Sequence, residues 1–160
     1  MTISSADIVY RLSGEGSNAD PLLSFGGAKS SVAVSQLFGT IDSAEAAAGS
    51  VKYLCVYLHN ANGVDTMTAP KLFVLINTPS ADTTIEIGIG AAGVNGTETA
   101  VANITTAPAG VSFSAPSTLG AALAMSNIPA GQHQSFWVKR TVNAGASALD
   151  NDGCTLLTSL

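Results

Sequence analysis

Short apolar runs alternate with groups of Gly, Pro, Asn and Ser along the whole chain. Residues 84–90 (TIEIGIG) show the clearest pattern, because three isoleucines occupy alternate positions, as in a strand with one buried face. Residues 51–59 (VKYLCVYLH) and 71–77 (KLFVLIN) are apolar at nearly every position, which indicates strands covered on both faces. The same signals predict further strands at residues 7–12, 29–37, 111–115, 121–126, 134–142 and 154–160.

Helical character is confined to residues 42–48 (DSAEAAA). Asp42 or Ser43 can cap the first turn, and Gly49 can end the last one. About two turns are too few for a helix that is stable by itself, so we expect a connector between strands.

These elements predict an all-β fold with almost no helix. About eight to ten short strands separated by turn signals are typical of a two-sheet antiparallel β-sandwich, of the jelly-roll or immunoglobulin-like kind. The sequence has no internal repeat, no linker and no break in composition. We therefore expect one domain over residues 1–160, with residues 1–27 as a loosely packed N-terminal arm.

The composition is unusual in its low charge. Hydrophobic residues make up 46% of the chain and charged residues 11%, against about 25% charged in an ordinary soluble domain. A surface of hydroxyls and small apolar groups does little to keep copies apart, and it suits a subunit packed against neighbours. The six Lys and Arg residues are scattered and the net charge is −5, so we expect no binding to nucleic acid or to anionic membrane. The first ten residues lack the pattern of a secretory signal, and no apolar run approaches the ~18 residues of a transmembrane helix.

Candidate catalytic groups are few. His59 and His133 are the two histidines, and either could in principle act as a base. A polar residue at a strand end is the favoured interpretation of both, and the sequence contains no Gly-x-Ser-x-Gly nucleophile elbow. Cys55 lies within an apolar strand and is expected to be a buried, unreactive thiol. Free thiols are the expectation for Cys55 and Cys154 after synthesis in a cytosol, although their pairing is open. The acidic residues are mostly isolated at turns, which favours turn geometry over a carboxylate pair; they include Asp20, Asp42, Asp65, Asp82 and the strand residue Glu86.

Two segments bear a partial likeness to ligand-binding loops. Residues 150–153 (DNDG) look like the start of a calcium loop, but no Glu follows to complete twelve positions, so a plain turn is favoured. Residues 88–93 (GIGAAG) follow a strand without opening a helix, which favours a bulge or a close strand approach over a phosphate loop. We assign no catalytic, cofactor-binding or metal-binding residue, and we expect a protein that is not an enzyme and holds no cofactor.

The strand aromatics allow two interpretations. Tyr53, Tyr57, Phe136 and Trp137 could form a platform on which sugars stack. Such residues more often fill a sandwich core or an oligomer interface, and this second interpretation is favoured.

Several segments together resemble a family of small structural proteins of tailed bacteriophages and prophages. They occur in the same order along nearly the whole chain, and each is a turn or strand segment with no active-site signature; they are residues 8–14 (IVYRLSG), 26–31, 51–60, 71–79, 106–116 (TAPAGVSFSAP), 127–132 (NIPAGQ), 136–142 (FWVKRTV), 144–146 and 151–153. The resemblance implies a virion component with a β-sandwich fold.

The placement that this resemblance favours is a capsid decoration, or cement, protein on the outer surface of the head. The expected partners are the major capsid protein and further copies of the same chain, in a homo-oligomer such as a trimer. Synthesis would take place in the bacterial host cytoplasm, and the final location would be the virion. The alternative is a tail- or baseplate-associated sandwich that binds host-surface glycans.

Overall fold

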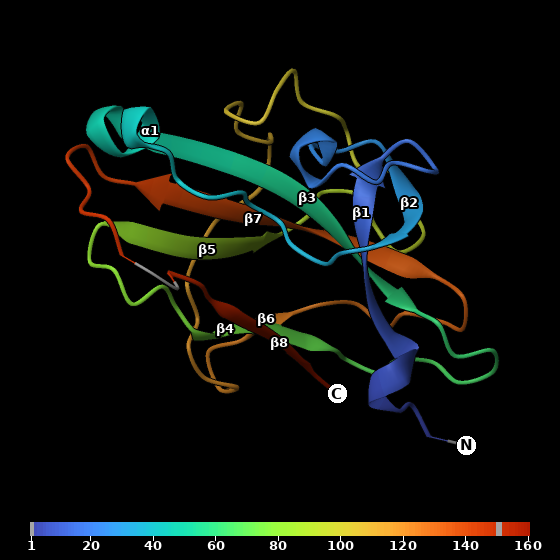
Figure 1. Ribbon diagram of the computed structural model, residues 1–160. Coiled ribbons are helices and arrows are strands. Elements are labelled where there is room, and N and C mark those ends of the chain that lie inside the picture. Colours follow the sequence, from blue (N-terminus) through green and yellow to red (C-terminus); the bar gives the residue numbers. More distant parts are fainter. Residues whose placement is uncertain (1, 150–151) are drawn as a thin grey trace.

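A computed structural model describes residues 2–149 and 152–160 and consists mainly of strands (Figure 1). Its elements follow the chain in the order η1 (Ser5–Asp7), β1 (Ile8–Gly14), η2 (Pro21–Leu23), β2 (Ala28–Ala33), α1 (Ser43–Ala48), β3 (Ser50–Asn60), β4 (Lys71–Ile76), β5 (Thr83–Ile89), β6 (Leu123–Ala124), β7 (His133–Val142) and β8 (Thr155–Ser159). The all-β prediction is confirmed.

Two antiparallel sheets form the layers of a sandwich (Figure 1). The larger has the order β2-β1-β3-β7-β5 and the smaller the order β6-β4-β8. The longest pairing joins β3 to β7 and runs without interruption from Ser50 opposite Val142 to His59 opposite His133. The expected two-sheet antiparallel architecture is therefore present, with sheets of unequal width.

The main core lies between the two sheets. Val56 and Leu58 of β3 and Val138 of β7 come from the larger sheet, whereas Leu72 and Val74 of β4 come from the smaller one. The isoleucines of β5 alternate as predicted, since the side chains at positions 85 and 87 are buried in this core and the one at 89 packs against it. Full burial of a side chain of this size stabilises the fold by about 1.5–3 kcal/mol.

A second, smaller core covers the opposite face of the larger sheet. Cys55, Tyr57 and Trp137 are completely buried there. Side chains from irregular segments cover these residues, among them those of Phe25 and Phe113. The yellow part of the chain in Figure 1 lies over this face. The double-faced pattern of β3 is thus confirmed, and loops, not a third sheet, cover its second face.

One predicted strand is absent and two are shorter than their patterns suggested. Residues 111–115 form no strand and contribute one bridge, between Ser114 and Ile87. Only Leu123 and Ala124 of residues 121–126 pair as a strand, and the strand predicted at 29–37 ends at Ala33. Apart from that bridge, the contribution of residues 111–115 comes from side chains, because Val111 and Phe113 pack onto the smaller core.

Part of the predicted N-terminal arm belongs to the packed sheet. β1 pairs with β2 on one side and with β3 on the other. The loop that follows is held by the buried hydroxyl of Ser24, which receives the Ser13 amide at 2.6 Å and donates to the Cys55 carbonyl at 2.9 Å. Residues 8–14 and Ser24 are therefore structural, and the expectation of a loose arm is wrong for this stretch.

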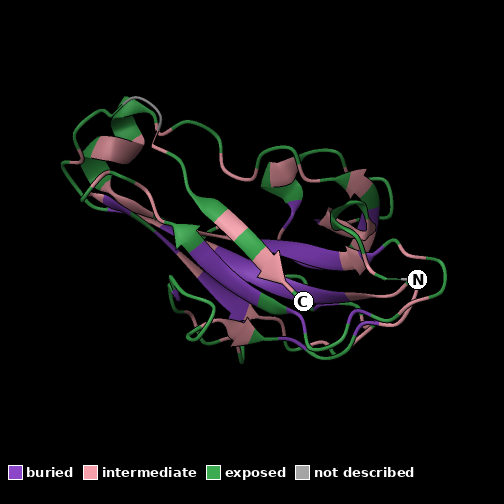
Figure 2. Cartoon of the chain, turned by 90° about the horizontal axis from the view of Figure 1, so that it is seen from below, coloured by how far each residue is buried: buried purple, intermediate pink, exposed green. Residues whose placement is uncertain are grey.

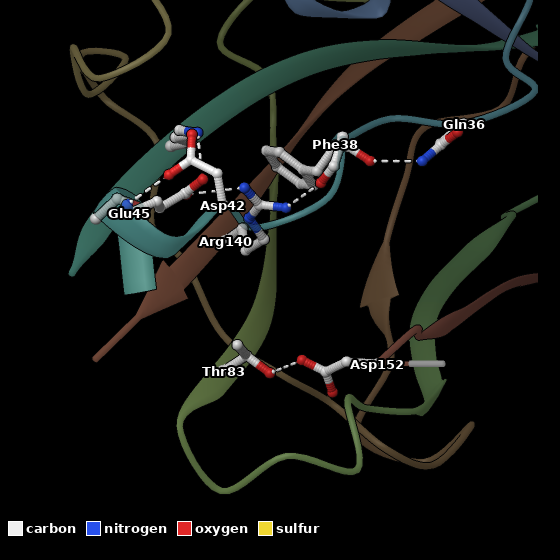
Figure 3. Close-up of polar contacts among 10 residues, drawn as sticks. Gln36, Phe38, Asp42, Glu45, Thr83, Arg140 and Asp152 are labelled. Atoms are coloured by element: carbon white, nitrogen blue, oxygen red, sulfur yellow. Dashed lines mark hydrogen bonds and ion pairs between the residues drawn. The ribbon is translucent and has the colours of Figure 1, made fainter. Parts of the chain in front are cut away.

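The predicted connector helix is present as α1, and an ion-pair network holds it against β7 (Figure 3). Asp42 caps it by accepting the Glu45 amide at 2.7 Å, and Gly49 ends it. The Glu45 carboxylate meets the Arg140 guanidinium at 2.9 Å and the Lys52 ammonium at 2.8 Å. These contacts provide the stability that two helical turns lack by themselves.

Candidate interaction surface

The two histidines lie side by side at one end of the larger sheet. His59 is opposite His133 in the β3–β7 register. The His59 Nδ1 atom is 3.1 Å from the Gln132 carbonyl oxygen, and the His133 ring meets Tyr57 edge-on at 5.0 Å. Burial and the nearby positive charge of Lys29 lower the pKa of both rings. A general base is usually oriented by a carboxylate, and among the described residues neither ring is hydrogen-bonded to one.

A buried carboxylate, which the sequence patterns did not reveal, lies nearby. Glu98 is 4% exposed and accepts the Ser135 hydroxyl at 2.5 Å and the Ala92 amide at 3.2 Å. Its own amide donates to the Tyr57 hydroxyl at 2.8 Å. Ser135 is fully buried, so this polar cluster fastens a loop to the sheet and does not expose a nucleophile. Glu98 follows no pattern in the sequence, because its partners come from distant segments.

Gly88 and Gly90 explain the glycine-rich run after β5. A Cβ atom on Gly88 would lie 2.5 Å from the Ser112 carbonyl oxygen, and one on Gly90 would overlap the Ser135 hydroxyl and the Glu98 carboxylate. The sequence predicted a bulge or a close strand approach at this run, and the structure has a close backbone approach that is made by the loop around Ser112. The glycines make room for the loop that covers the sheet.

The cysteines and two turn acids have the surroundings that their patterns indicated. Cys55 is buried and free, and burial raises the pKa of its thiol far above the usual range. Cys154 is free and exposed. Asp20 caps η2 by accepting the Leu22 amide at 2.9 Å, as Asp42 caps α1.

The calcium-like segment lies partly outside the described residues, because residues 150 and 151 are not described. Its third residue, Asp152, accepts a hydrogen bond from the Ser80 amide. It also accepts one from the Thr83 hydroxyl (Figure 3). Among the residues that the structure describes, no three His, Cys, Asp or Glu side chains gather where they could hold a metal ion.

Three of the four candidate sugar-stacking aromatics are buried. Tyr57 and Trp137 are 0% exposed and Phe136 is 1% exposed. Tyr53 is half-buried and packs against Phe113 with the ring centroids 5.5 Å apart. The favoured prediction that these side chains fill a core is confirmed for Tyr57, Phe136 and Trp137, and the alternative of a sugar platform built from all four is wrong.

The smaller sheet presents an open strand edge. In the part of the chain that the structure describes, β8 pairs with β4 on one side and with no strand on the other. Its sequence, TLLTS, contains no charge and no proline, the usual devices that protect an edge from pairing with another chain. Figure 2 shows β8 as a run of exposed and intermediate residues that crosses the buried larger sheet.

Apolar side chains flank this edge on the outer side. Leu72 and Val74 point into the core, so the alternation of a strand directs Leu75 outward. Leu75 and Leu157 are 45% and 39% exposed. Exposed leucines on two paired strands form a patch of the kind that marks protein–protein contact.

A small apolar hollow lies on the unpaired side of β8. Its volume is about 90 Å³, and its lining comes from β8, from the larger sheet and from the segment after β2: Tyr10, Val34, Leu37, Val56, Phe136 and Leu156. None of these residues comes from β4. We call the free edge of β8, the flanking leucines and this hollow the β8 surface.

No protein-family model, no curated protein and no solved structure matches the chain. Within the described residues, no helix has the length and apolar character needed to cross a membrane.

Proposed function

We propose that the protein is a structural component of a tailed-bacteriophage virion, a decoration protein that binds the outer surface of the capsid. There it bridges neighbouring major capsid protein subunits and associates with further copies of itself, in a trimer or another small homo-oligomer. The observation that carries this proposal is the β8 surface, an uncharged strand edge with exposed leucines beside it.

The chemistry of an open edge supports an assembly role. Unpaired backbone N–H and C=O groups on β8 can receive a strand from another chain, and pairing of this kind supplies affinity through main-chain hydrogen bonds. A side chain of the added strand can enter the apolar hollow beside Leu156. Burial of the leucines of the β8 surface adds about 25 cal/mol for each Å² of apolar area removed from water.

The low charge of the chain supports the same role. Charged residues are depleted at the centres of protein interfaces, and they make up 11% of this sequence. A protein that binds the assembled shell but not its separated subunits stabilises the shell through mass action. Many copies on a repeating lattice multiply modest contacts.

The experiment is a binding assay with assembled shells of the major capsid protein from the phage that carries this gene. The wild-type chain should cosediment with the shells to saturation and raise their melting temperature, and electron microscopy should locate it on the outer surface. Leu157→Lys should bind at least about tenfold more weakly, as expected for a residue at the centre of an interface.

The matched control is Val64→Lys, because Val64 is 69% exposed and lies outside the β8 surface. It should bind like the wild type, and circular dichroism should show that both variants are folded. Equal binding of Leu157→Lys and the wild type would remove the β8 surface as the docking site. Location of the chain in the tail or baseplate would overturn the capsid proposal.

A further inference from the structure

The outer face of the larger sheet gathers four basic side chains from four strands. Arg11 of β1 is opposite Tyr57 of β3, and His59 follows Tyr57 by two residues, so all three point to the same face. His133 of β7 is opposite His59, and Lys29 of β2 is opposite Ser13. This face is turned away from the smaller sheet and its β8 surface.

These four groups are close enough to influence one another. After burial, which is the largest cause, the charge of Arg11 lowers the pKa of Lys29. The charges of Lys29 and Arg11 also lower the pKa of His59, and the charges of Lys29 and His59 lower that of His133. All four residues are half-buried, so water and an incoming group can reach them. We call these four residues the basic cluster.

The cluster has no compensating carboxylate among the described residues. Three of the other cations have one, since Lys52 and Arg140 contact Glu45 and Lys139 contacts Glu86 at 2.6 Å. Neither Lys29 nor Arg11 forms such a pair in the part of the chain that the structure describes.

The hydrogen bonds around the cluster go to backbone carbonyls, so they do not neutralise the positive charges of Arg11 and Lys29. Arg11 donates one hydrogen bond, to the Ser31 carbonyl, while its buried Nε atom has no partner. The nearby groups on the packed elements are Tyr57, whose hydroxyl donates to the Gly27 carbonyl at 2.6 Å, and Glu98, which is buried and held by Ser135 and two backbone amides. Like charges held together raise the energy of the folded state, and a bound anion removes that cost.

We propose that Arg11, Lys29, His59 and His133 form a docking site for carboxylate side chains on an acidic segment of another protein. Arginine matches a carboxylate with two parallel hydrogen bonds, and lysine adds a mobile point charge. Two permanent charges are too few for an anionic membrane, which recruits clusters of about four to eight. The chain as a whole is acidic, with a net charge of −5, so a polyanion as long as a nucleic acid meets repulsion on either side of the cluster. This proposal does not depend on whether the protein decorates a capsid.

The experiment follows the ring protons of both histidines by NMR during pH titrations at constant ionic strength. The probe in one arm is a hexaglutamate peptide at millimolar concentration, and in the other it is inorganic phosphate. The peptide should raise the pKa of both His59 and His133 by about half a unit or more, because an opposite charge favours the protonated ring.

The test variant is Lys29→Gln, and the matched control is Lys71→Gln, since Lys71 is exposed at the start of β4 on the smaller sheet. Without any probe, Lys29→Gln should raise the pKa of both histidines, which verifies a folded sheet and adjacent charges. With the peptide, Lys29→Gln should bind about fivefold more weakly than the wild type, and Lys71→Gln should bind equally well.

Three results would overturn the proposal. The first is a peptide that leaves both pKa values unchanged, and the second is undiminished binding by Lys29→Gln. The third is a shift caused by phosphate and not by peptide, which would reveal a site for small free anions. None of these results bears on the outcome of the shell-binding assay, because that assay tests the β8 surface on the opposite side of the molecule.

Discussion

Replacement of Glu45 by Ala should cost more stability than removal of any exposed acid in the chain. The Glu45 side chain is 9% exposed, and its carboxylate accepts from Arg140, Lys52 and the Ser50 hydroxyl, the last at 2.5 Å. The Arg140 side chain is 8% exposed, so the substitution leaves a positive charge buried without its partner (Figure 3).

The magnitude follows from what Arg140 retains. Breaking a buried ion pair by removing one partner costs about 3–5 kcal/mol. Arg140 still donates to the Gly39 carbonyl at 2.8 Å and lies over the Phe38 ring at 4.8 Å, which favours the lower end, about 3 kcal/mol. For a domain of this size the melting temperature should fall by about 6–12 °C.

The assay is urea and thermal unfolding at pH 7, with Glu86→Ala as the matched control. Glu86 also pairs with a lysine, at 2.6 Å, but both side chains are about a quarter exposed, and such pairs contribute about 0–1 kcal/mol. Glu45→Ala must therefore lose at least about 2 kcal/mol more than Glu86→Ala. Equal losses, or a loss below about 1 kcal/mol for Glu45→Ala, would refute the assignment of this network as a buried anchor for α1.

The pH dependence supplies a second readout for Glu45. Burial raises the pKa of its carboxyl, but the hydrogen bonds from Lys52 and Ser50 and the charge of Arg140 outweigh burial and leave the pKa lowered. A carboxyl whose folded pKa is lowered adds stability above its unfolded pKa, and that stability is lost as pH falls through the folded value. Glu45→Gln should therefore flatten the loss of stability below about pH 4.5.

Three further predictions concern a glycine of the glycine-rich run after β5, the two histidines and the two cysteines. Gly90→Ala should destabilise the fold by about 1–3 kcal/mol, because its Cβ overlaps the buried polar cluster, whereas Gly93→Ala, with nothing within 4 Å of its Cβ, should unfold like the wild type in urea. The pKa values of His59 and His133 are lowered from 6.5. The contribution of these rings to stability is therefore present above that pH and is lost as pH falls through the folded pKa values. The double variant His59→Gln/His133→Gln should show a shallower loss of stability below pH 6.5 in urea titrations, and an unchanged slope would contradict the lowered pKa values. One thiol per chain, that of Cys154, should react with a thiol reagent in the native protein, and rapid reaction of both cysteines would show that the buried thiol is accessible.

Local periodicity along the chain was enough to predict several of the strands. Alternating isoleucines define β5, and apolar residues at almost every position of β3 predict cover on both faces. The Asp42 cap and the Gly49 end of α1 could be predicted for the same reason, because capping depends on residues within one turn. These features were predictable because neighbours in the sequence supply the interactions.

The cover of the larger sheet, the open edge of β8 and the basic cluster depend on contacts between segments that are distant in the sequence. Apolar residues at 111 and 113 indicate a strand, but the segment pairs with β5 through a single bridge, and these two side chains pack onto the smaller core that covers the larger sheet. The open edge of β8 depends on the order of strands in the smaller sheet, and that order has no local signal. The basic cluster likewise consists of residues that are scattered along the sequence, and only the register of four paired strands brings their charges together.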